Sequence, residues 1–459
     1  MNEEKKTKGT VSFYTLGCKV NQYETQMLKE RFSDAGYDIA GEEEFADIYV
    51  VNTCTVTNLS DRKSRQYIRR MKKINPDAVI AVTGCYAQTD SEAAADIEGV
   101  CVVAGTNEKS ELVKFVEDYI SENGQKRINV DSHIIPYDEL SEYEETGIIT
   151  SMDSRTRAYI KVQEGCDRFC SYCIIPYARG KVRSRRLEDI VAEAEQLIGN
   201  GFKELVLTGI NTALYGTDTE ADERGLRGIE SLIAAINEIK GDFRIRLSSL
   251  EPNVVDVATV RNLAKYKKLC HHMHLSIQSG SDTVLKRMNR RYDYADYLEI
   301  VRAMKETDAN YAITTDIIVG FPGETDEEFQ ESLKAVNEVG FSGVHVFRYS
   351  KRRGTKAADM KDQIDGNKKN ERSAKLISAA SDAASRFNER NTGSVRRVLF
   401  ERFDEEAGML EGHSDNYIKV YCRPDVGPAD AKELLDGFAD VYLEKLYKDG
   451  IEGRIVASV

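Results

Sequence analysis

Short apolar strands alternate with helical segments along most of this chain, and that alternation limits its fold more than any other feature. In the first part the predicted strands lie at 11–16, 47–51 and 78–82. Six more are predicted at 158–162, 204–207, 243–247, 272–277, 312–319 and 344–347. Apolar strands separated by helices predict parallel sheets covered by helices. We therefore expect an α/β chain with a doubly wound domain over 9–120 and an open, partial (β/α)6 TIM-like barrel within 153–391.

Two further segments complete the expected domain organisation. Residues 121–152 are acidic and lack long apolar runs, so we expect a linker with one short strand at 128–130. A long helix is predicted at 366–391, at the end of the barrel region. Short strands separated by turns over 392–459 predict a small all-β barrel.

The number of cysteines and the hydropathy of the chain indicate the cellular compartment in which the protein works. The chain has nine cysteines, an odd number, which argues for a reducing compartment and against a disulfide framework. The first ten residues are polar and charged, so we expect no secretory signal. No apolar run approaches the ~18–20 residues of a membrane span. The expectation is a cytoplasmic protein without a membrane partner.

The net charge of −13 argues against nucleic-acid binding by the chain as a whole, yet basic residues gather in local runs. A predicted helix at 61–74 carries candidates for RNA phosphate contacts, namely Arg62, Lys63, Arg65, Arg69 and Arg70. A second basic run lies at 179–186. Such runs can bind phosphates on an acidic chain, and solvated helix faces are the alternative.

The C-terminal barrel offers two aromatic candidates for RNA binding. Tyr417 and Tyr421 are expected to be exposed, so that either ring could stack on a base. Because this segment is not rich in basic residues, a purely structural barrel is the alternative.

Three cysteines within eight residues have the spacing Cys-x3-Cys-x2-Cys: Cys166, Cys170 and Cys173. Three thiolates on one loop can bind three irons of a 4Fe–4S cluster and leave the fourth iron open to a small ligand. Zinc is the alternative, but a structural zinc ion is normally bound by four ligands. No His or Cys follows Cys173 until Cys270, so the spacing favours the iron–sulfur cluster.

Three other cysteines occupy equivalent positions in the predicted sheet. Cys18, Cys54 and Cys85 each follow the end of a predicted strand. The carboxyl ends of parallel strands meet at one edge of a sheet, where ligands bind. We therefore expect these cysteines to converge on a second metal cluster, with three unrelated buried thiols as the alternative. We expect packing or surface roles for His271, His272 and His274, which alternate along another strand.

The Cys166–Cys173 loop, with Tyr172 before its last cysteine, resembles the signature of radical S-adenosylmethionine enzymes. In that family the open iron binds S-adenosylmethionine, and one electron cleaves it to a 5′-deoxyadenosyl radical. The resemblance implies that Tyr172 lies against the adenine. It also implies a ring of polar and glycine residues around S-adenosylmethionine, namely Thr208, Gly209, Glu251, Gln278, Gly320 and Gly323. Gly209 and Gly323 can equally be ordinary turn glycines.

The N-terminal motifs Gly-Cys-Lys-Val-Asn, Asn-Thr-Cys-Thr-Val-Thr and Thr-Gly-Cys-Tyr-Ala-Gln resemble those of radical methylthiotransferases. In that family these cysteines hold an auxiliary 4Fe–4S cluster that carries or supplies sulfur. The C-terminal segment resembles a TRAM domain, an RNA-binding barrel. The resemblance implies two clusters, two molecules of S-adenosylmethionine and a methylthio product. Arg348 and Arg353 depart from the family pattern, which has prolines there.

The branch motifs favour one substrate. Lys19-Val20-Asn21 and Thr55-Val56-Thr57 look like the branch that acts on carbon 2 of N6-threonylcarbamoyladenosine beside the anticodon. N6-isopentenyladenosine in tRNA and a ribosomal-protein aspartate are the alternatives within the family. The implied partners are a tRNA anticodon stem-loop, a reductase or flavodoxin-type electron donor and a sulfur donor. A non-catalytic iron–sulfur protein that binds RNA or senses redox state is the alternative from another class.

Overall fold

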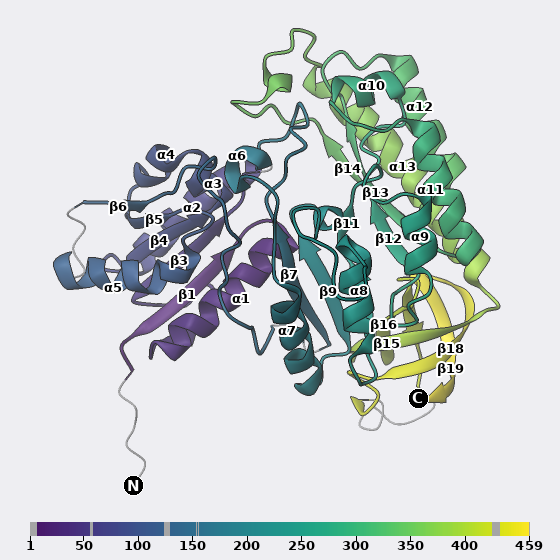
Figure 1. Ribbon diagram of the computed structural model, residues 1–459, viewed down its shortest axis with the longest axis horizontal. Coiled ribbons are helices and arrows are strands. Elements are labelled where there is room, and N and C mark those ends of the chain that lie inside the picture. Colours follow the sequence, from purple (N-terminus) through teal and green to yellow (C-terminus); the bar gives the residue numbers. More distant parts are fainter. Residues whose placement is uncertain are drawn as a thin grey trace.

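The computed structural model describes residues 7–55, 58–123, 129–152, 154, 156–424 and 432–458. Three sheet-based units follow one another along the chain, as Figure 1 shows. They are an N-terminal α/β unit, a curved arc of strands in the centre and a closed β-barrel at the C-terminal end. The α/β fold class predicted from the alternation of strands and helices is confirmed.

The N-terminal unit is a six-stranded parallel sheet in the order β2-β1-β3-β4-β5-β6. Its strands are β1 (Thr10–Thr15), β2 (Asp38–Ala40), β3 (Ile48–Thr53), β4 (Val79–Gly84), β5 (Val100–Ala104) and β6 (Asp131–His133). β3 and β4 are buried over their whole length, as expected for central strands with both faces covered. This position places their carboxyl ends side by side.

Helices cover both faces of this sheet. One face packs against α1 (Lys19–Asp34) and α5 (Leu112–Asn123), and the other against α2 (Asn58–Ile74), α3 (Cys85–Thr89) and α4 (Ser91–Ala95). A short 3-10 helix, η1 (Lys109–Glu111), precedes α5. Alternate side chains of β3 enter the two cores because successive residues of a strand point to opposite faces.

The segment that the sequence assigned to a linker contributes to this sheet. α5 continues past residue 120, and β6 pairs in parallel with β5 at the sheet edge. The strand begins at Asp131 instead of the predicted residue 128, which lies outside the described residues. The run around β6 is short and polar, so its strand character depends on pairing with β5.

The central unit is an open arc of parallel strands. They are β7 (Arg157–Glu164), β9 (Glu204–Gly209), β10 (Arg244–Leu247), β11 (Ser249–Leu250), β12 (His272–Leu275), β13 (Ala312–Val319) and β14 (Gly343–Arg348). The short β8 (Arg183–Ser184) pairs antiparallel with β7. Only Ser248 separates β10 from β11, so the two four-stranded sheets continue into one arc. This arrangement matches the expected partial barrel.

The helices of the central unit are short or medium in length, except for the last. They are α6 (Ile175–Arg179), α7 (Leu187–Gly199), α8 (Gly228–Glu238), α9 (Val257–Leu263), α10 (Asp282–Arg287), α11 (Tyr294–Thr307), α12 (Asp326–Val339) and α13 (Gly366–Asn391), with 3-10 turns η2 (Thr212–Leu214) and η3 (Lys356–Ala358). α12 shows how sequence sets the ends: Thr325 and Glu328 form a capping box, and Gly340 ends the helix in the left-handed conformation. The predicted helix at 366–391 coincides with α13.

The C-terminal unit is a closed five-stranded barrel in the order β15-β16-β17-β19-β18. Its strands are β15 (Val395–Asp404), β16 (Met409–Ser414), β17 (Lys419–Cys422), β18 (Phe438–Tyr447) and β19 (Gly450–Ser458). β18 pairs back with β15, which closes the barrel. Within the described part of the chain, no helix has both the length and the apolar character required to cross a bilayer.

Candidate active site

The cluster loop, residues 166–173, follows β7 and precedes α6. The backbone N–H of Cys166 donates to the Gly180 carbonyl at 2.9 Å, and that of Cys173 donates to the Cys170 carbonyl at 2.9 Å. Phe169 adopts the left-handed conformation, with φ of 46°. These features fold the loop so that its three cysteines lie close together.

The thiols of the loop lie within electrostatic range of one another. Burial raises the pKa of Cys166 and Cys173 to about 12, and the charge of Cys170 acts in the same direction. Three such thiols can ionise together only if a cation compensates them. An iron–sulfur cluster supplies that charge, so the donor set fits the group that the sequence predicted.

The spacing of the thiols does not fit a single zinc ion. Zn–S bonds of about 2.3 Å hold tetrahedral ligand atoms about 3.8 Å apart. Among the described residues, the one group with three ligand atoms within 4.8 Å of one another contains no cysteine. Neither cysteine set, as its side chains stand, has three sulfur atoms that close together.

Arg290 ties the loop to the end of the strand arc. Its Nη1 donates to Cys170 Sγ at 3.1 Å, and its Nη2 lies 3.4 Å from Glu251 Oε1. Glu251 Oε2 accepts from Arg168 Nε at 3.0 Å and from Asn211 Nδ2 at 2.8 Å. Glu251, which the sequence placed near S-adenosylmethionine, thus has both oxygens occupied by protein donors and positions the loop.

A cavity of about 240 Å³ opens beside the cluster loop. Its lining includes Tyr172, Cys173, Gln278, Asp316 and Phe347. Gln278 has a left-handed backbone, with φ of 67°, and bridges between the ends of β12 and β13. Tyr172 and Gln278 therefore lie where the sequence expected a ligand.

The other predicted S-adenosylmethionine contacts do not line this cavity. Thr208 is 1% exposed at the end of β9. A Cβ on Gly209 would lie 2.9 Å from Gln163 Oε1, so this glycine permits close approach of β7. Gly320 and Gly323 have φ of 69° and 73°, and the N–H of Gly320 donates to Glu324 at 2.7 Å. The two turn glycines therefore supply the left-handed backbone conformation that the loop after β13 adopts.

The N-terminal cysteine site, formed by Cys18, Cys54 and Cys85, lies at the edge predicted from the strand ends. Cys54 follows β3 directly, Cys85 begins α3 after β4, and Cys18 precedes α1. A Cβ on Gly17 would lie 2.9 Å from Cys54 Cβ and 3.1 Å from its sulfur, so Cys54 packs against the turn that carries Cys18. The predicted motif residues Val56 and Thr57 lie outside the described residues.

Arg179, at the end of α6, connects the two cysteine sets. Its Nε donates to Cys85 Sγ at 3.2 Å, and its Nη2 donates to Asn21 Oδ1 at 3.0 Å. Asn21 Oδ1 lies 3.7 Å from Cys18 Sγ. Arg179 follows Cys173 by only six residues, so one short segment serves both sites.

A buried charge network surrounds Arg179, and its members are Glu24, Lys109, Lys161, Glu164 and Arg179. Arg179 lies 3.1 Å from Glu164, and Lys161 lies 2.8 Å from the same carboxylate. Burial alone would raise the pKa of Glu164, but Arg179 and Lys161 hold it at about 2. Three cations against two carboxylates leave one positive charge beside Cys85.

The prediction that residues 179–186 form a basic surface face is wrong for most of the run. Arg179, Arg183 and Arg185 are at most 3% exposed. Arg185 pairs with buried Glu193 and with Glu145, 2.8 Å away. Basic residues this close in sequence normally indicate a solvent-exposed face. Here the acidic residues that pair with them come from distant parts of the chain.

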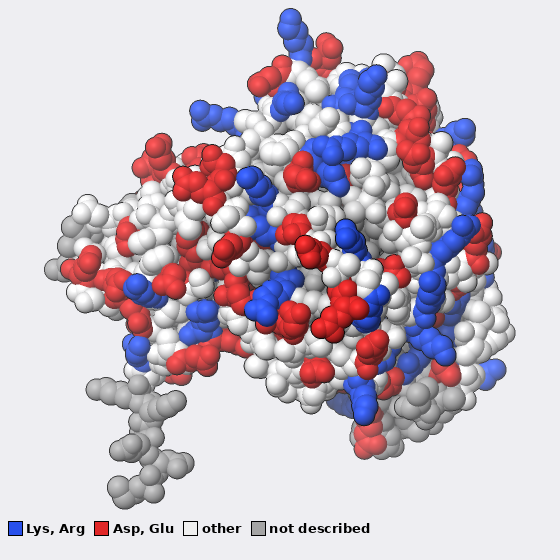
Figure 2. Space-filling view, in the orientation of Figure 1, with Lys and Arg blue, Asp and Glu red and all other residues white. Residues whose placement is uncertain are grey.

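The basic helix α2 presents part of its charge to solvent. Arg62, Lys63 and Arg69 are exposed. Arg65 is half-buried and reaches the Tyr86 hydroxyl at 3.5 Å, and Arg70 pairs with Glu43 at 2.7 Å. Figure 2 shows acidic and basic groups interspersed on the face drawn. RNA binding by these five residues remains a prediction.

The expected exposure of two barrel tyrosines is wrong. Tyr421 is 1% exposed, and its hydroxyl donates to Asp449. Tyr417 is half-buried: the Arg246 guanidinium lies 3.5 Å from its ring centroid, and the His413 ring stacks on it at 4.7 Å. Tyr417 therefore joins the small barrel to the floor of the strand arc instead of offering a free ring to RNA.

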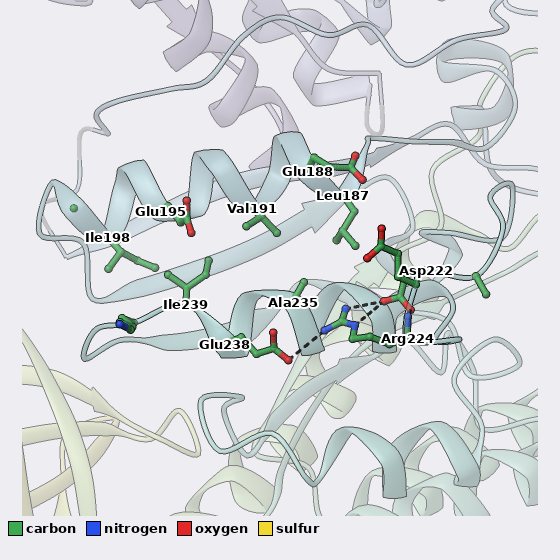
Figure 3. Close-up of a pocket in the computed structure, with 14 residues that line it drawn as sticks. Leu187, Glu188, Val191, Glu195, Ile198, Asp222, Arg224, Ala235, Glu238 and Ile239 are labelled. Carbon is green, nitrogen blue, oxygen red and sulfur yellow. Dashed lines mark hydrogen bonds and ion pairs between the residues drawn. The ribbon is translucent and has the colours of Figure 1, made fainter.

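A wide groove of about 1080 Å³ lies between α7 and α8, as Figure 3 shows. Its polar lining is mainly acidic, and Arg224 pairs there with Asp222 at 2.7 Å and with Glu238 at 3.5 Å. None of the six motif cysteines lines it. The candidate active site is therefore the smaller cavity at the cluster loop.

Sequence reasoning missed the residues that hold the cysteines in place. Arg290 lies among other basic residues at 286–291, and Arg179 lies in the basic run at 179–186; neither pattern indicates a sulfur partner. Their partners, Cys170 and Cys85, are 120 and 94 residues away in sequence. Only the fold brings these pairs together.

Two family models match the chain. The model described as the Radical SAM superfamily matches residues 160–336. The model described as uncharacterized protein family UPF0004 matches residues 10–105. The two matches therefore cover the cluster loop and the N-terminal cysteine site, respectively.

Several relatives resemble nearly the whole chain. A Bacillus subtilis protein named threonylcarbamoyladenosine tRNA methylthiotransferase MtaB is 44% identical over 414 residues, 90% of each chain. A Thermotoga maritima protein of the same name is 39% identical over 411 residues, 89% of this chain and 90% of the relative. A Clostridium tetani protein named tRNA-2-methylthio-N(6)-dimethylallyladenosine synthase is 35% identical over 463 residues, 99% of this chain and 98% of the relative.

A solved structure supports the fold. The radical S-adenosylmethionine methyltransferase TsrM from Kitasatospora setae has a TM-score of 0.55 and 16% identity, covering 76% of each chain. At that identity the likeness concerns the fold alone. Together with the near full-length relatives, the matches show that the chain belongs to the radical S-adenosylmethionine methylthiotransferase family.

Proposed function

We propose that this enzyme adds a methylthio group to carbon 2 of N6-threonylcarbamoyladenosine beside the anticodon of tRNA. The observation that carries the proposal is Arg179, which reaches Cys85 from the segment that also contains Cys173. Cys173 precedes the five-residue helix α6 by two residues and Arg179 ends that helix, which is roughly 7.5 Å long. A reaction that joins a radical to a sulfur donor requires the two cysteine sets to be near each other, and this short connection supports that requirement.

The six cysteines are proposed as ligands of two 4Fe–4S clusters, with S-adenosylmethionine at the cluster loop. When bound, these groups would supply one-electron cleavage of S-adenosylmethionine and would carry or supply the sulfur for the product. Arg290 and Arg179 each donate to one cysteine sulfur, and these charge-assisted hydrogen bonds hold the two side chains in place. Tyr172 and Gln278 line the cavity in which the reacting molecules meet.

The choice of nucleoside rests on the relatives and on the motif after Cys18. The relatives at 39–44% identity carry the threonylcarbamoyladenosine name, and those at 34–35% identity carry either that name or the dimethylallyladenosine name. Lys19-Val20-Asn21 also follows the pattern of the threonylcarbamoyl branch. The proposed partners are the tRNA anticodon stem-loop, a one-electron reductase or flavodoxin-type donor, and a sulfur donor.

The direct test is turnover by the reconstituted enzyme. Anaerobic protein with dithionite and S-adenosylmethionine is given anticodon stem-loops that carry either threonylcarbamoyladenosine or dimethylallyladenosine. We expect 5′-deoxyadenosine with both reagents present and a methylthio nucleoside from the threonylcarbamoyl RNA. Product from the dimethylallyl RNA alone would assign the other tRNA substrate. Absence of 5′-deoxyadenosine would favour the non-catalytic iron–sulfur alternative.

A further inference from the structure

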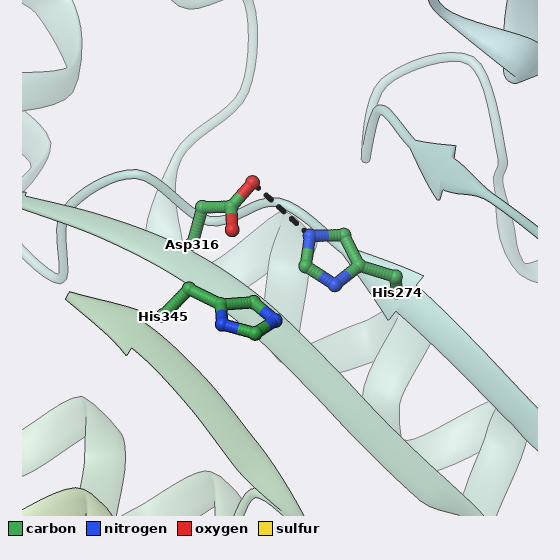
Figure 4. Close-up of side chains that lie close together, drawn as sticks. All are labelled: His274, Asp316 and His345. Carbon is green, nitrogen blue, oxygen red and sulfur yellow. Dashed lines mark ion pairs between the residues drawn. The ribbon is translucent and has the colours of Figure 1, made fainter. Parts of the chain in front are cut away.

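Three side chains from neighbouring strands of the arc form a group that is separate from both cysteine sets. They are His274 on β12, Asp316 on β13 and His345 on β14, and Figure 4 shows them turned toward one another. Each side chain offers one atom that can bind a metal, and these three atoms lie within 4.8 Å of one another. The group therefore brings two imidazoles and one carboxylate to a single point.

The register of the strands fixes this arrangement. His274 is the direct neighbour of Thr314, and Asp316 is the direct neighbour of His345. Asp316 lies two residues after Thr314 and points to the same face of the sheet, because side chains alternate along a strand. The sequence predicted a packing or surface role for His274, since its two partners come from other strands and leave no local pattern.

The two ring nitrogens of His274 have different surroundings. Nδ1 lies 3.0 Å from the Thr314 hydroxyl oxygen, within hydrogen-bonding distance. Nε2 is buried and lies 3.1 Å from Asp316 Oδ2, but it has no hydrogen-bond partner among the described residues. A histidine that binds a metal normally uses one nitrogen for the metal and the other for a hydrogen bond that orients the ring. His274 has this arrangement, with Nε2 as the available ligand atom.

The spacing of the group fits one small divalent ion bound by nitrogen and oxygen. Ligand atoms about 2.1 Å from the same ion lie about 3.0–3.4 Å apart. The 3.1 Å between His274 Nε2 and Asp316 Oδ2 falls in this range. His345 is exposed, so its ring has room to turn toward the other two ligands. Two imidazoles and one carboxylate are a known ligand set of transition-metal sites that keep coordination positions open.

The group adjoins the cavity at the cluster loop. Asp316 lines that cavity together with Cys173 and Gln278. The backbone N–H of Gln278 donates to the Asp316 carbonyl at 2.9 Å, which ties the end of β13 to the cavity wall. An ion held by the Asp316 carboxylate therefore lies beside the space in which a ligand of the cluster loop is expected.

We propose that His274, Asp316 and His345 bind one divalent transition-metal ion, separate from the clusters proposed for the two cysteine sets. Mn²⁺, Fe²⁺ and Zn²⁺ are the ions that such mixed imidazole and carboxylate sites take. Three protein ligands leave positions for carboxylate or hydroxyl oxygens of a molecule in the cavity, which the ion binds as a Lewis acid. The inference goes beyond the proposed function and does not depend on which nucleoside the enzyme modifies.

The test is binding of Mn²⁺ to the anaerobically reconstituted enzyme, after treatment with EDTA to remove other loosely bound ions. Mn²⁺ is the probe because it prefers oxygen and nitrogen ligands to thiolates and so leaves the cysteine sets to iron. Electron paramagnetic resonance of free Mn²⁺ measures the affinity, and electron spin-echo modulation detects nitrogen bound to the ion. We expect one ion per chain with coordinated nitrogen, and binding weaker by about tenfold or more in His345→Ala and in Asp316→Asn.

The controls separate this site from other acidic or histidine-containing surfaces. His133→Gln removes the histidine of a His–Asp pair, 2.7 Å from Asp131, that belongs to no such group of three among the described residues, and it is expected to bind Mn²⁺ as wild type does. Because His345 is exposed, His345→Ala is expected to keep the iron content and the thermal midpoint of wild type.

Two results would overturn the inference. If wild type binds no Mn²⁺ with coordinated nitrogen, the three side chains form only an ion-paired polar group. If His345→Ala and Asp316→Asn bind Mn²⁺ as tightly as wild type, the ion lies elsewhere, for example in the acidic groove between α7 and α8. If Asp316→Asn loses iron, His345→Ala alone decides between these outcomes. None of these results bears on methylthio transfer, which the turnover assay tests separately.

Discussion

The two cysteine sites are built in opposite ways. The cluster loop takes its three cysteines from eight consecutive residues, and the fold contributes mainly the supports Arg290 and Met288 from the turn after α10. The N-terminal cysteine site takes one cysteine from each of three strand ends and one cation, Arg179, from another unit. A local site can be recognised from spacing, whereas an assembled site depends on sheet order and on docking of the two units.

The strongest test of this comparison is removal of one cluster-loop ligand. Cys166→Ala is expected to abolish 5′-deoxyadenosine and methylthio product, and to lower iron from about eight to about four atoms per chain. Iron quantification and chromatography of the reaction measure both effects. Cys270→Ala, which removes a buried thiol outside both sets, is the control. Unchanged iron in Cys166→Ala would refute the ligand assignment.

The reciprocal change breaks the assembled site. Cys85→Ala is expected to remove the methylthio product completely but to leave formation of 5′-deoxyadenosine, because the cluster loop keeps its own cysteines. The same assays measure it, with Cys101→Ala as a buried-thiol control on β5. If Cys85→Ala also stops cleavage of S-adenosylmethionine, the two sites are not separate in function.

Loss of Arg179 tests how the units are joined. Arg179→Met removes one of three cations that neutralise Glu24 and Glu164, and it removes the donor to Cys85. Lys109 and Lys161 still compensate the two carboxylates, but both carboxylates lose their guanidinium donor, and a lost hydrogen bond to a charged group costs about 1.5–3 kcal/mol. We expect a lower denaturation midpoint and less iron at the N-terminal cysteine site, with partial recovery in Arg179→Lys. A stable variant with full iron would show that the network does not support that site.

A smaller effect is expected at the local site. Arg290→Met removes a charge-assisted hydrogen bond to Cys170 and one partner of Glu251. The rate of 5′-deoxyadenosine formation should fall about tenfold, the value of one such bond, while the loop keeps its iron. The electron paramagnetic resonance spectrum of the reduced cluster would report the changed environment of the thiolate. A rate equal to wild type would show that Arg290 has no influence on the bound cluster.

The smallest effect concerns the surface near the N-terminal unit. Replacing Arg62 and Lys63 by glutamine should weaken tRNA binding a few-fold and make its salt dependence shallower, by roughly 0.7–0.9 in log–log slope per lost phosphate contact. Filter binding at several salt concentrations measures the slope. Replacing exposed Lys334 of α12 and exposed Lys375 of α13 by glutamine provides a charge-matched comparison. Unchanged binding would mean that α2 presents an ordinary solvated face.

Sequence patterns predicted those parts of the molecule that depend on neighbouring residues. Most of the longer strands, the long helix α13 and the spacing of the cluster loop follow from local alternation, apolar runs and motif spacing, whereas the two- or three-residue strands β2, β8 and β11 were not predicted. The convergence of Cys18, Cys54 and Cys85 also followed, because parallel strands place their carboxyl ends at one edge.

The remaining features depend on pairs that are distant in sequence. Arg179 and Glu24 are 155 residues apart, and burial of this pair reverses what a basic run normally indicates. Tyr417 is half-buried because Arg246 of another unit lies over its ring. β6 forms a strand because it pairs in parallel with β5 at the edge of the sheet. Side-chain pairing across units leaves no local pattern, so such residues become visible only in the folded chain.

The most direct measurement of the central claim is nucleoside mass spectrometry of tRNA from cells with and without this gene. The account predicts loss of the methylthio form of N6-threonylcarbamoyladenosine, with the unmodified precursor accumulating and other methylthio nucleosides unchanged. Loss of the methylthio dimethylallyl nucleoside instead, or no change in any methylthio nucleoside, would contradict it.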